Sequence, residues 1–160
     1  MDDVGLETLW IELKADCQAA AVAAETAHAM FAEETLGRLA SAGHYLSRFF
    51  NIVEQMSLRV AKAFENNIDD EKGWHSELIR RMTLTLPGIR PALLTAEMAR
   101  CLQHLRGFRH IFTHAYDLDL DPAQLTLQLG YMDGVKQELP TAARQFVEGV
   151  AAMHGLTPPQ

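Results

Sequence analysis

The residues best suited to chemistry lie in one short stretch of the sequence, RHIFTHAY at residues 109–116. Arg109 is followed directly by His110, then by His114 and, two residues later, by Tyr116. Histidine titrates near neutral pH and can accept or donate a proton during a reaction. Arginine keeps its charge and can bind an oxyanion through two N–H groups. The stretch is therefore either a site that acts on a phosphate or an ordinary polar helix end.

The full pattern of Arg-x4-His-x-Tyr is rare. With ten arginines and seven histidines in 160 residues, Arg-x4-His arises by chance about 0.4 times, and a tyrosine two residues later lowers this to about 0.01. The pattern also lies at the end of an expected helix, beside an arginine-rich segment. This context favours the interpretation as a site.

Arginines gather in residues 78–116. This segment has a formal charge of +5, whereas the whole chain has -7. The overall charge argues against indiscriminate binding to nucleic acid or to an anionic membrane. The bias toward arginine nevertheless suits phosphate, although a set of solvated helix faces would explain it too. The charged residues are Arg80, Arg81, Arg90, Arg100, Arg106, Arg109 and one acid, Glu97, and the same segment holds His104, His110 and His114.

Length and composition limit the class of protein. A chain of 160 residues is expected to form one domain, over residues 1–155, with a flexible tail at 156–160. No apolar run reaches the roughly 18 residues that span a bilayer, and the acidic start MDDVGLETLW is no secretory signal, so we expect a cytoplasmic protein. Cys17 and Cys101 are too few for a disulfide framework, and each is expected to be a buried free thiol.

Apolar residues recur every three or four positions along the whole chain, which predicts an all-α fold. The first helix is rich in alanine and is expected to run to about residue 39, with a break of small residues at 40–42. The second stripe runs from Leu46 to Ala63, and a polar turn is expected at residues 66–73.

Three further segments complete the expected bundle. A shorter helix should run from about residue 74 to 86, and Thr95 should cap a fourth helix. Asp121 and Pro122 have the signature of another helix start. Pro140 should break or kink that helix, or open a final one. The pattern predicts an antiparallel up-and-down bundle of four to five helices.

Arg109 and His114 are five residues apart, or about 140° around a regular helix, which is awkward for two groups that act on one atom. The helix could loosen near His114. Alternatively, two copies of the chain could meet along this helix and share one cleft.

RHIFTHAY resembles the R-x4-H-x-Y signature of the HEPN superfamily, specifically of HepT-like toxins. The specific match covers about residues 105–122, and His110 takes the place of the polar residue that commonly follows the arginine. The rest of the chain is similar in general character, because the family fold is an all-helical bundle. The resemblance implies a HEPN-like homodimer and a metal-independent endoribonuclease toxin that needs no cofactor.

The resemblance also implies roles for individual residues. Arg109 and His114 would be catalytic, with His114 as general base or acid and Arg109 as the phosphate clamp. Supporting or RNA-binding roles would fall to Arg106, His110 and Thr113. RNA would be cut by its own 2'-hydroxyl and left with a cyclic phosphate.

In HepT-like proteins the tyrosine of the motif is adenylylated by a partner nucleotidyltransferase, the antitoxin, which silences the toxin. Tyr116 is the matching residue here. Phosphates beside Arg109 and His114 would fill the oxyanion site and repel RNA. The alternative is that Tyr116 packs at the end of the bundle with its hydroxyl in water.

Two other functions remain open. His110 and His114 are spaced so that they could bind a metal, with Asp117, Asp119 or Asp121 as oxygen ligands only if the loop folds back. The chain could also be a non-catalytic substrate-binding or adaptor subunit of a small nucleotidyltransferase. Such an adaptor would tolerate the loss of His114, whereas an enzyme would not.

Overall fold

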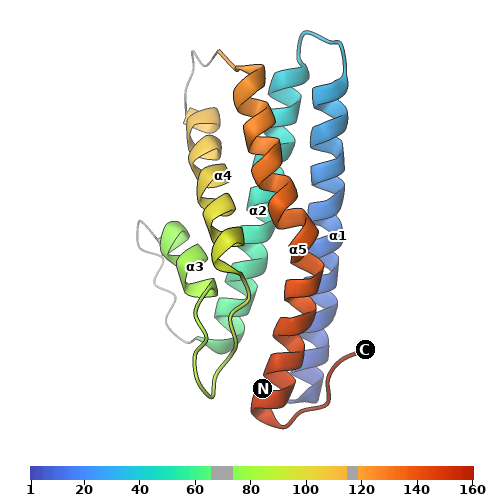
Figure 1. Cartoon of the computed structure of the whole chain (residues 1–160). Coiled ribbons are helices and arrows are strands. Elements are labelled where there is room, and N and C mark those ends of the chain that lie inside the picture. The colour runs from blue at the N-terminus through green and yellow to red at the C-terminus, as the bar shows by residue number, and fades with distance from the viewer. Residues whose placement is uncertain (66–73, 115–118) are drawn as a thin grey trace.

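The computed structural model describes residues 1–65, 74–114 and 119–160 and, within residues 74–76, the backbone alone. These residues form no strand, apart from an isolated bridge between Leu86 and Arg90. Four long helices lie side by side and alternate in direction, and one short helix lies against α2 and α4 (Figure 1). The prediction of an all-α, up-and-down bundle is confirmed. The helices are α1 (Asp3–Ala32), α2 (Arg38–Phe64), α3 (Trp74–Met82), α4 (Ala96–His114) and α5 (Pro122–His154).

The core consists of the apolar stripes that the sequence predicts. Each long helix turns one face inward, and residues such as Leu13, Phe49, Leu105 and Met132 have almost no exposed surface. Burial of each such side chain contributes about 1.5 to 3 kcal/mol to stability. On α4, Met98 and Cys101 are also buried, whereas Phe108 and Phe112, further along the helix, are half-buried.

Two helix starts follow the capping residues that the sequence predicts. The Thr95 hydroxyl accepts a hydrogen bond from the Met98 N–H at 3.1 Å. Asp121 accepts one from the Ala123 N–H at 2.9 Å, and Pro122 is the first residue of α5. Such caps stabilise a helix because they satisfy N–H groups that have no partner within it. Both predictions are confirmed.

The boundary between the first two helices was predicted wrongly. α1 ends at Ala32, well before residue 39, and residues 40–42 lie inside α2. Two acidic residues, Glu33 and Glu34, follow Ala32, and negative charge is unfavourable at a helix C-terminus. The Arg38 guanidinium then donates a hydrogen bond to the Phe31 carbonyl at 2.7 Å, which satisfies one of the last carbonyls of α1.

Gly43 lies within α2, at the point where α4 approaches this helix closely. A Cβ atom at this position would lie 2.7 Å from the ring of Phe112. The glycine therefore allows the aromatic side chain in the middle of RHIFTHAY to pack directly on the α2 backbone. It fixes the last turns of α4 against α2 and does not mark a break.

Two further expectations need correction. α3 ends at Met82 and not near residue 86, and the Met82 carbonyl accepts hydrogen bonds from the Leu93 and Leu94 N–H groups at 2.9 and 3.0 Å instead of continuing the helix. α5 continues past Pro140 to His154, so the proline neither ends this helix nor opens another, and of the three alternatives only a kink remains. The predicted polar turn at residues 66–73 lies outside the described residues.

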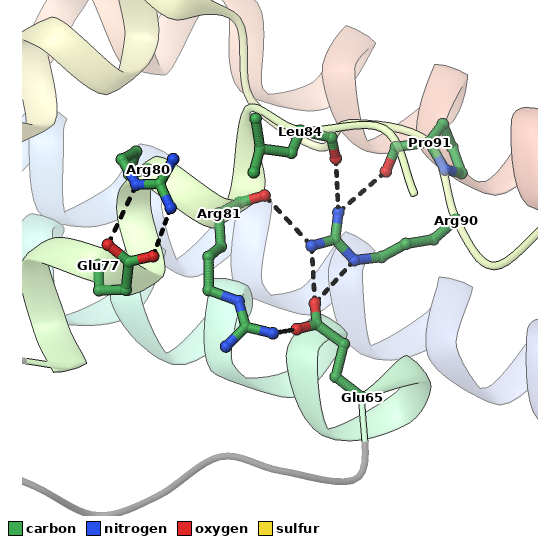
Figure 2. Close-up of polar contacts among 7 residues, drawn as sticks. All are labelled: Glu65, Glu77, Arg80, Arg81, Leu84, Arg90 and Pro91. Carbon is green, nitrogen blue, oxygen red and sulfur yellow. Dashed lines mark hydrogen bonds and ion pairs between the residues drawn. The ribbon is translucent and has the colours of Figure 1, made fainter. Parts of the chain in front are cut away.

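A buried ion pair holds the chain between α3 and α4 against the end of α2 (Figure 2). Arg90 is fully buried and donates to the Glu65 carboxylate from Nε at 3.0 Å and from Nη2 at 2.7 Å. It also donates to the carbonyls of Leu84, Pro91 and Arg81, and the Arg81 side chain pairs with Glu65. Burial lowers the pKa of the Arg90 guanidinium. All of these partners satisfy a charge that would otherwise be costly to bury.

The last residues of the chain contact α1 and α5. The Trp10 indole donates to the Gln160 carbonyl at 2.9 Å, and Arg144 donates to the Pro159 carbonyl at 2.7 Å. Both cysteines are free thiols, as expected, but only Cys101 is buried; Cys17 is half-buried, and burial of its thiol raises its pKa to about 11. Within the described residues, no helix is both long enough and apolar enough to cross a membrane.

Candidate active site

Residues 109–114 of the RHIFTHAY stretch form the last turns of α4, at the end of the bundle where α1 connects to α2 (Figure 1). Arg109, His110, Thr113 and His114 belong to the helix, whereas Tyr116 lies outside the described residues. α4 is attached here by Phe112, which packs on α2 at Gly43. Phe108 stacks on Phe112 with ring centroids 5.6 Å apart. The polar residues of the motif thus lie at a helix end whose apolar side packs against α2.

Arg109 faces α2. Its Nη1 donates a hydrogen bond to Oδ1 of Asn51 at 2.6 Å, and its guanidinium carbon lies 5.1 Å from the centre of the Phe50 ring. Oε1 of Glu54 lies 4.0 Å from the same nitrogen. The Arg109 side chain is 29% exposed, so the guanidinium is oriented by α2 yet still open to solvent.

Glu54 and Asn51 are site residues that the sequence analysis missed. The Glu54 side chain is only 4% exposed, although carboxylates are rarely buried unless they are paired. The one signal in the sequence is that it lies four residues after Phe50 and seven before Ala61, in a second buried stripe of α2. A charged residue in a buried stripe indicates a partner, but the sequence does not say which one.

His110 and His114 lie together on an exposed part of α4. Their rings stack with centroids 4.6 Å apart. Nδ1 of His114 lies 2.9 Å from the His110 carbonyl oxygen and 2.9 Å from the Thr113 hydroxyl. A carbonyl only accepts hydrogen bonds, so Nδ1 of the neutral ring carries the proton and Nε2 keeps its lone pair. Nε2 is therefore the atom that can act as a base.

Thr113 connects the two parts of the motif. Its hydroxyl donates to the Arg109 carbonyl at 2.8 Å and lies beside the His114 ring. The side chains of Arg109 and His114 nevertheless have different surroundings, since the first contacts α2 and the second contacts His110. α4 stays helical through His114, so the loosening considered in the sequence analysis does not occur before this residue.

Most arginines around the motif pair with carboxylates. Arg80 binds Glu77, Arg100 binds Glu97, and Arg81 and Arg90 share one glutamate. Their carboxylate partners offset the charge of these four arginines, which weakens the interpretation of this segment as a phosphate-binding surface. Arg106 makes no ion pair with any residue in the described part of the chain. It is half-buried and lines a shallow hollow with Gly107, His110 and Ile111.

Metal ligands do not gather in the part of the chain that the structure describes. No group of three or more histidine, cysteine, aspartate or glutamate side chains there is arranged to hold an ion. His110 and His114 pack ring against ring. What the motif offers is therefore a proton-transfer group, a fixed cation and a hydroxyl.

Comparison with known proteins gives one result. No curated protein and no solved structure matches the chain. A family model described as HepT-like protein matches residues 41–150, which include nearly all of α2, the whole of α3 and α4, and most of α5. The matched region covers more than half of the chain and contains the complete R-x4-H-x-Y motif together with Asn51 and Glu54. The chain therefore belongs to the family of HepT-like proteins.

Proposed function

We propose that this protein is a metal-independent endoribonuclease and the toxin of a toxin–antitoxin pair. HepT-like proteins are related to the HEPN ribonucleases, and the family is generally paired with nucleotidyltransferase antitoxins. The observation that carries the proposal is the hydrogen bond from Nδ1 of the exposed His114 to the His110 carbonyl. That hydrogen bond leaves Nε2 as a base at the surface.

In the proposed reaction His114 accepts the proton of a ribose 2'-hydroxyl. The 2'-oxygen then bonds to the adjacent phosphorus, and the bond from phosphorus to the 5'-oxygen of the next nucleotide breaks. The leaving oxygen takes a proton, which His110 could supply. The products are a 2',3'-cyclic phosphate and a 5'-hydroxyl. Arg109 stabilises the charge that builds on the phosphate, and Arg106 and Thr113 support RNA binding and orientation.

The different surroundings of Arg109 and His114 support a homodimer. A second copy that faces the first along α4 would place Arg109 of one copy near His114 of the other in a shared cleft. One phosphate could then contact both groups without distortion of either helix. We further propose that the antitoxin is a small nucleotidyltransferase that adenylylates Tyr116.

The test of the proposal is RNA cleavage by the purified wild-type protein in EDTA, with analysis of fragment ends. We expect cleavage to persist in EDTA and to give cyclic phosphate and 5'-hydroxyl ends. Mass spectrometry of the same preparation must show that Tyr116 carries no adenylyl group. Lack of cleavage by unmodified protein, or cleavage that needs a divalent metal, would contradict the proposal.

A second candidate function is a non-catalytic adaptor that holds a nucleotidyltransferase. It is favoured by the Arg109 contacts, because a hydrogen bond to Asn51 and a packed Phe50 ring are also what a structural arginine needs. An adaptor would bind its partner equally well with or without His114. Unmodified protein that fails to cut RNA but binds its partner would establish this function instead.

The proposed enzyme makes a prediction for Asn51. Replacement with leucine removes the acceptor that orients Arg109, so we expect kcat to fall at least about tenfold while KM changes little. Steady-state kinetics on a short RNA would separate the two parameters. Gln55→Ala is the matched control, because it removes an exposed amide one turn further along α2. Equal kinetics for both variants would show that Asn51 does not position Arg109.

A further inference from the structure

A stacked pair of aromatic rings lies on the outer surface between α4 and α5. The His104 and Tyr131 rings are parallel to within 2°, with centroids 4.2 Å apart. The guanidinium carbon of Arg100 lies 5.5 Å from the centre of the Tyr131 ring. Tyr131 is half-buried, whereas His104 is exposed. One face of the imidazole covers the tyrosine, so the exposed surface of His104 includes its other face.

This pair lies on the same helix face as the candidate active site. His104, Gly107, Ile111 and His114 follow one another at spacings of three and four residues, which place them along one side of α4. Gly107 has no neighbouring atom where a side chain would begin, and it lines the hollow with His110 and Ile111. In the single chain a continuous exposed surface therefore runs from the stacked rings past the hollow to His114, and in the proposed homodimer this surface would line the shared cleft.

Arg106 supplies a positive charge to this surface, because it makes no ion pair within the described residues. The nearest acid in the sequence of α4 is Glu97, whose carboxylate binds Arg100 at 2.6 Å. This hydrogen bond lowers the pKa of Glu97, so the two charges remain and offset each other.

From this geometry we propose that His104 and Tyr131 form a base-stacking subsite for single-stranded RNA. A nucleobase stacks on the open face of His104 and extends the stack that His104 forms with Tyr131. Any base can do this, because every base has a π-face. Arg106 contacts the backbone between that base and the nucleotide at His114. The subsite holds RNA upstream or downstream of the cut without sequence preference. It rests on the proposed function but makes a separate claim about binding.

The test measures binding without cleavage. The probe is a short fluorescein-labelled single-stranded RNA with 2'-O-methyl groups, which cannot undergo attack by its own 2'-hydroxyl. We expect His104→Ala to weaken its binding at least about fivefold and His104→Tyr to restore it, because the aromatic face returns. Arg106→Gln should reduce the slope of log affinity against log salt by about 0.7, the value for one phosphate contact on a single strand.

His44→Ala is the matched control, because His44 is also exposed and contacts a tyrosine, but edge-on at 84°. That tyrosine, Tyr45, lines a groove between α1 and α2 on another part of the bundle. The control should bind the probe as the wild type does. Unchanged affinity of His104→Ala would overturn the subsite, and so would wild-type protein that does not bind the probe.

Cleavage of a dinucleotide separates the subsite from the active site. A dinucleotide spans the scissile bond alone, so its cleavage should be the same for wild type and His104→Ala. Loss of dinucleotide cleavage in His104→Ala would place this residue in the reaction itself and overturn the subsite. If no RNA is cut by any variant but His104→Ala still weakens probe binding, the proposed function fails and the subsite stands.

Discussion

Replacement of His114 with alanine is expected to reduce RNA cleavage at least about 100-fold, which is the lower range for the loss of a general acid or base. The Nδ1 of His114 is held by the His110 carbonyl, so Nε2 is the base that the variant loses. His110 stacks on this ring but serves the leaving oxygen in the proposed reaction, so it does not replace the base. Rates should be measured on one short RNA under single-turnover conditions, so that product release does not mask the chemical step.

His28→Ala is the control for this prediction. His28 is an exposed histidine of α1 that hydrogen bonds to Asp133 on α5 at 2.8 Å, away from the motif. It should cut RNA at the wild-type rate, and both variants should keep the wild-type helix content. If His114→Ala cuts RNA at the wild-type rate, His114 has no catalytic role. Thr113→Val should have a smaller effect, because it removes one neighbour of the ring and leaves the His110 carbonyl in place.

The sequence predicts the fold well where local chemistry decides it. Thr95 and Asp121 cap helices because their own side chains satisfy the first N–H groups, and this requires no distant residue. The end of α1 was missed because high alanine propensity was given more weight than the acidic pair that follows Ala32. The break predicted at residues 40–42 is wrong, because these small residues lie inside α2 next to Gly43, which makes room for Phe112, a residue far away in the sequence.

In the candidate site, too, the sequence does not predict contacts between residues that are far apart along the chain. The motif was identified from spacing within a single helix turn or two, and Arg109 and His114 do share the end of α4, whereas Tyr116 lies outside the described residues. The residue that orients Arg109 is Asn51, which is 58 positions away and has no distinctive neighbours in the sequence. Likewise, the arginine-rich segment predicts positive charge, but Glu65 and Glu97 neutralise part of it. Partners across the bundle depend on how the helices pack, and periodicity alone does not reveal this.

Replacement of Arg90 with methionine is expected to lower the free energy of unfolding by about 3 to 5 kcal/mol. The guanidinium is fully buried and donates to Glu65 and to three backbone carbonyls. Its loss leaves the Glu65 carboxylate, which is 8% exposed, with Arg81 as its partner among the described residues. An incompletely paired charge and carbonyls without donors are both costly inside a protein. Urea denaturation followed by circular dichroism would measure the change.

Arg80→Met is the matched control, because Arg80 and Glu77 form an exposed ion pair within α3. Such pairs contribute little, so the control should unfold close to the wild type. The double variant Glu65→Met with Arg90→Met should be more stable than the sum of the single losses predicts, because it leaves no buried charge unpaired and the Arg81 side chain, which loses Glu65, is 39% exposed. Strictly additive losses would show that Arg90 acts through packing alone. Since the pair lies near the start of α4 and the motif at its other end, a folded Arg90→Met protein should still cut RNA (Figures 1 and 2).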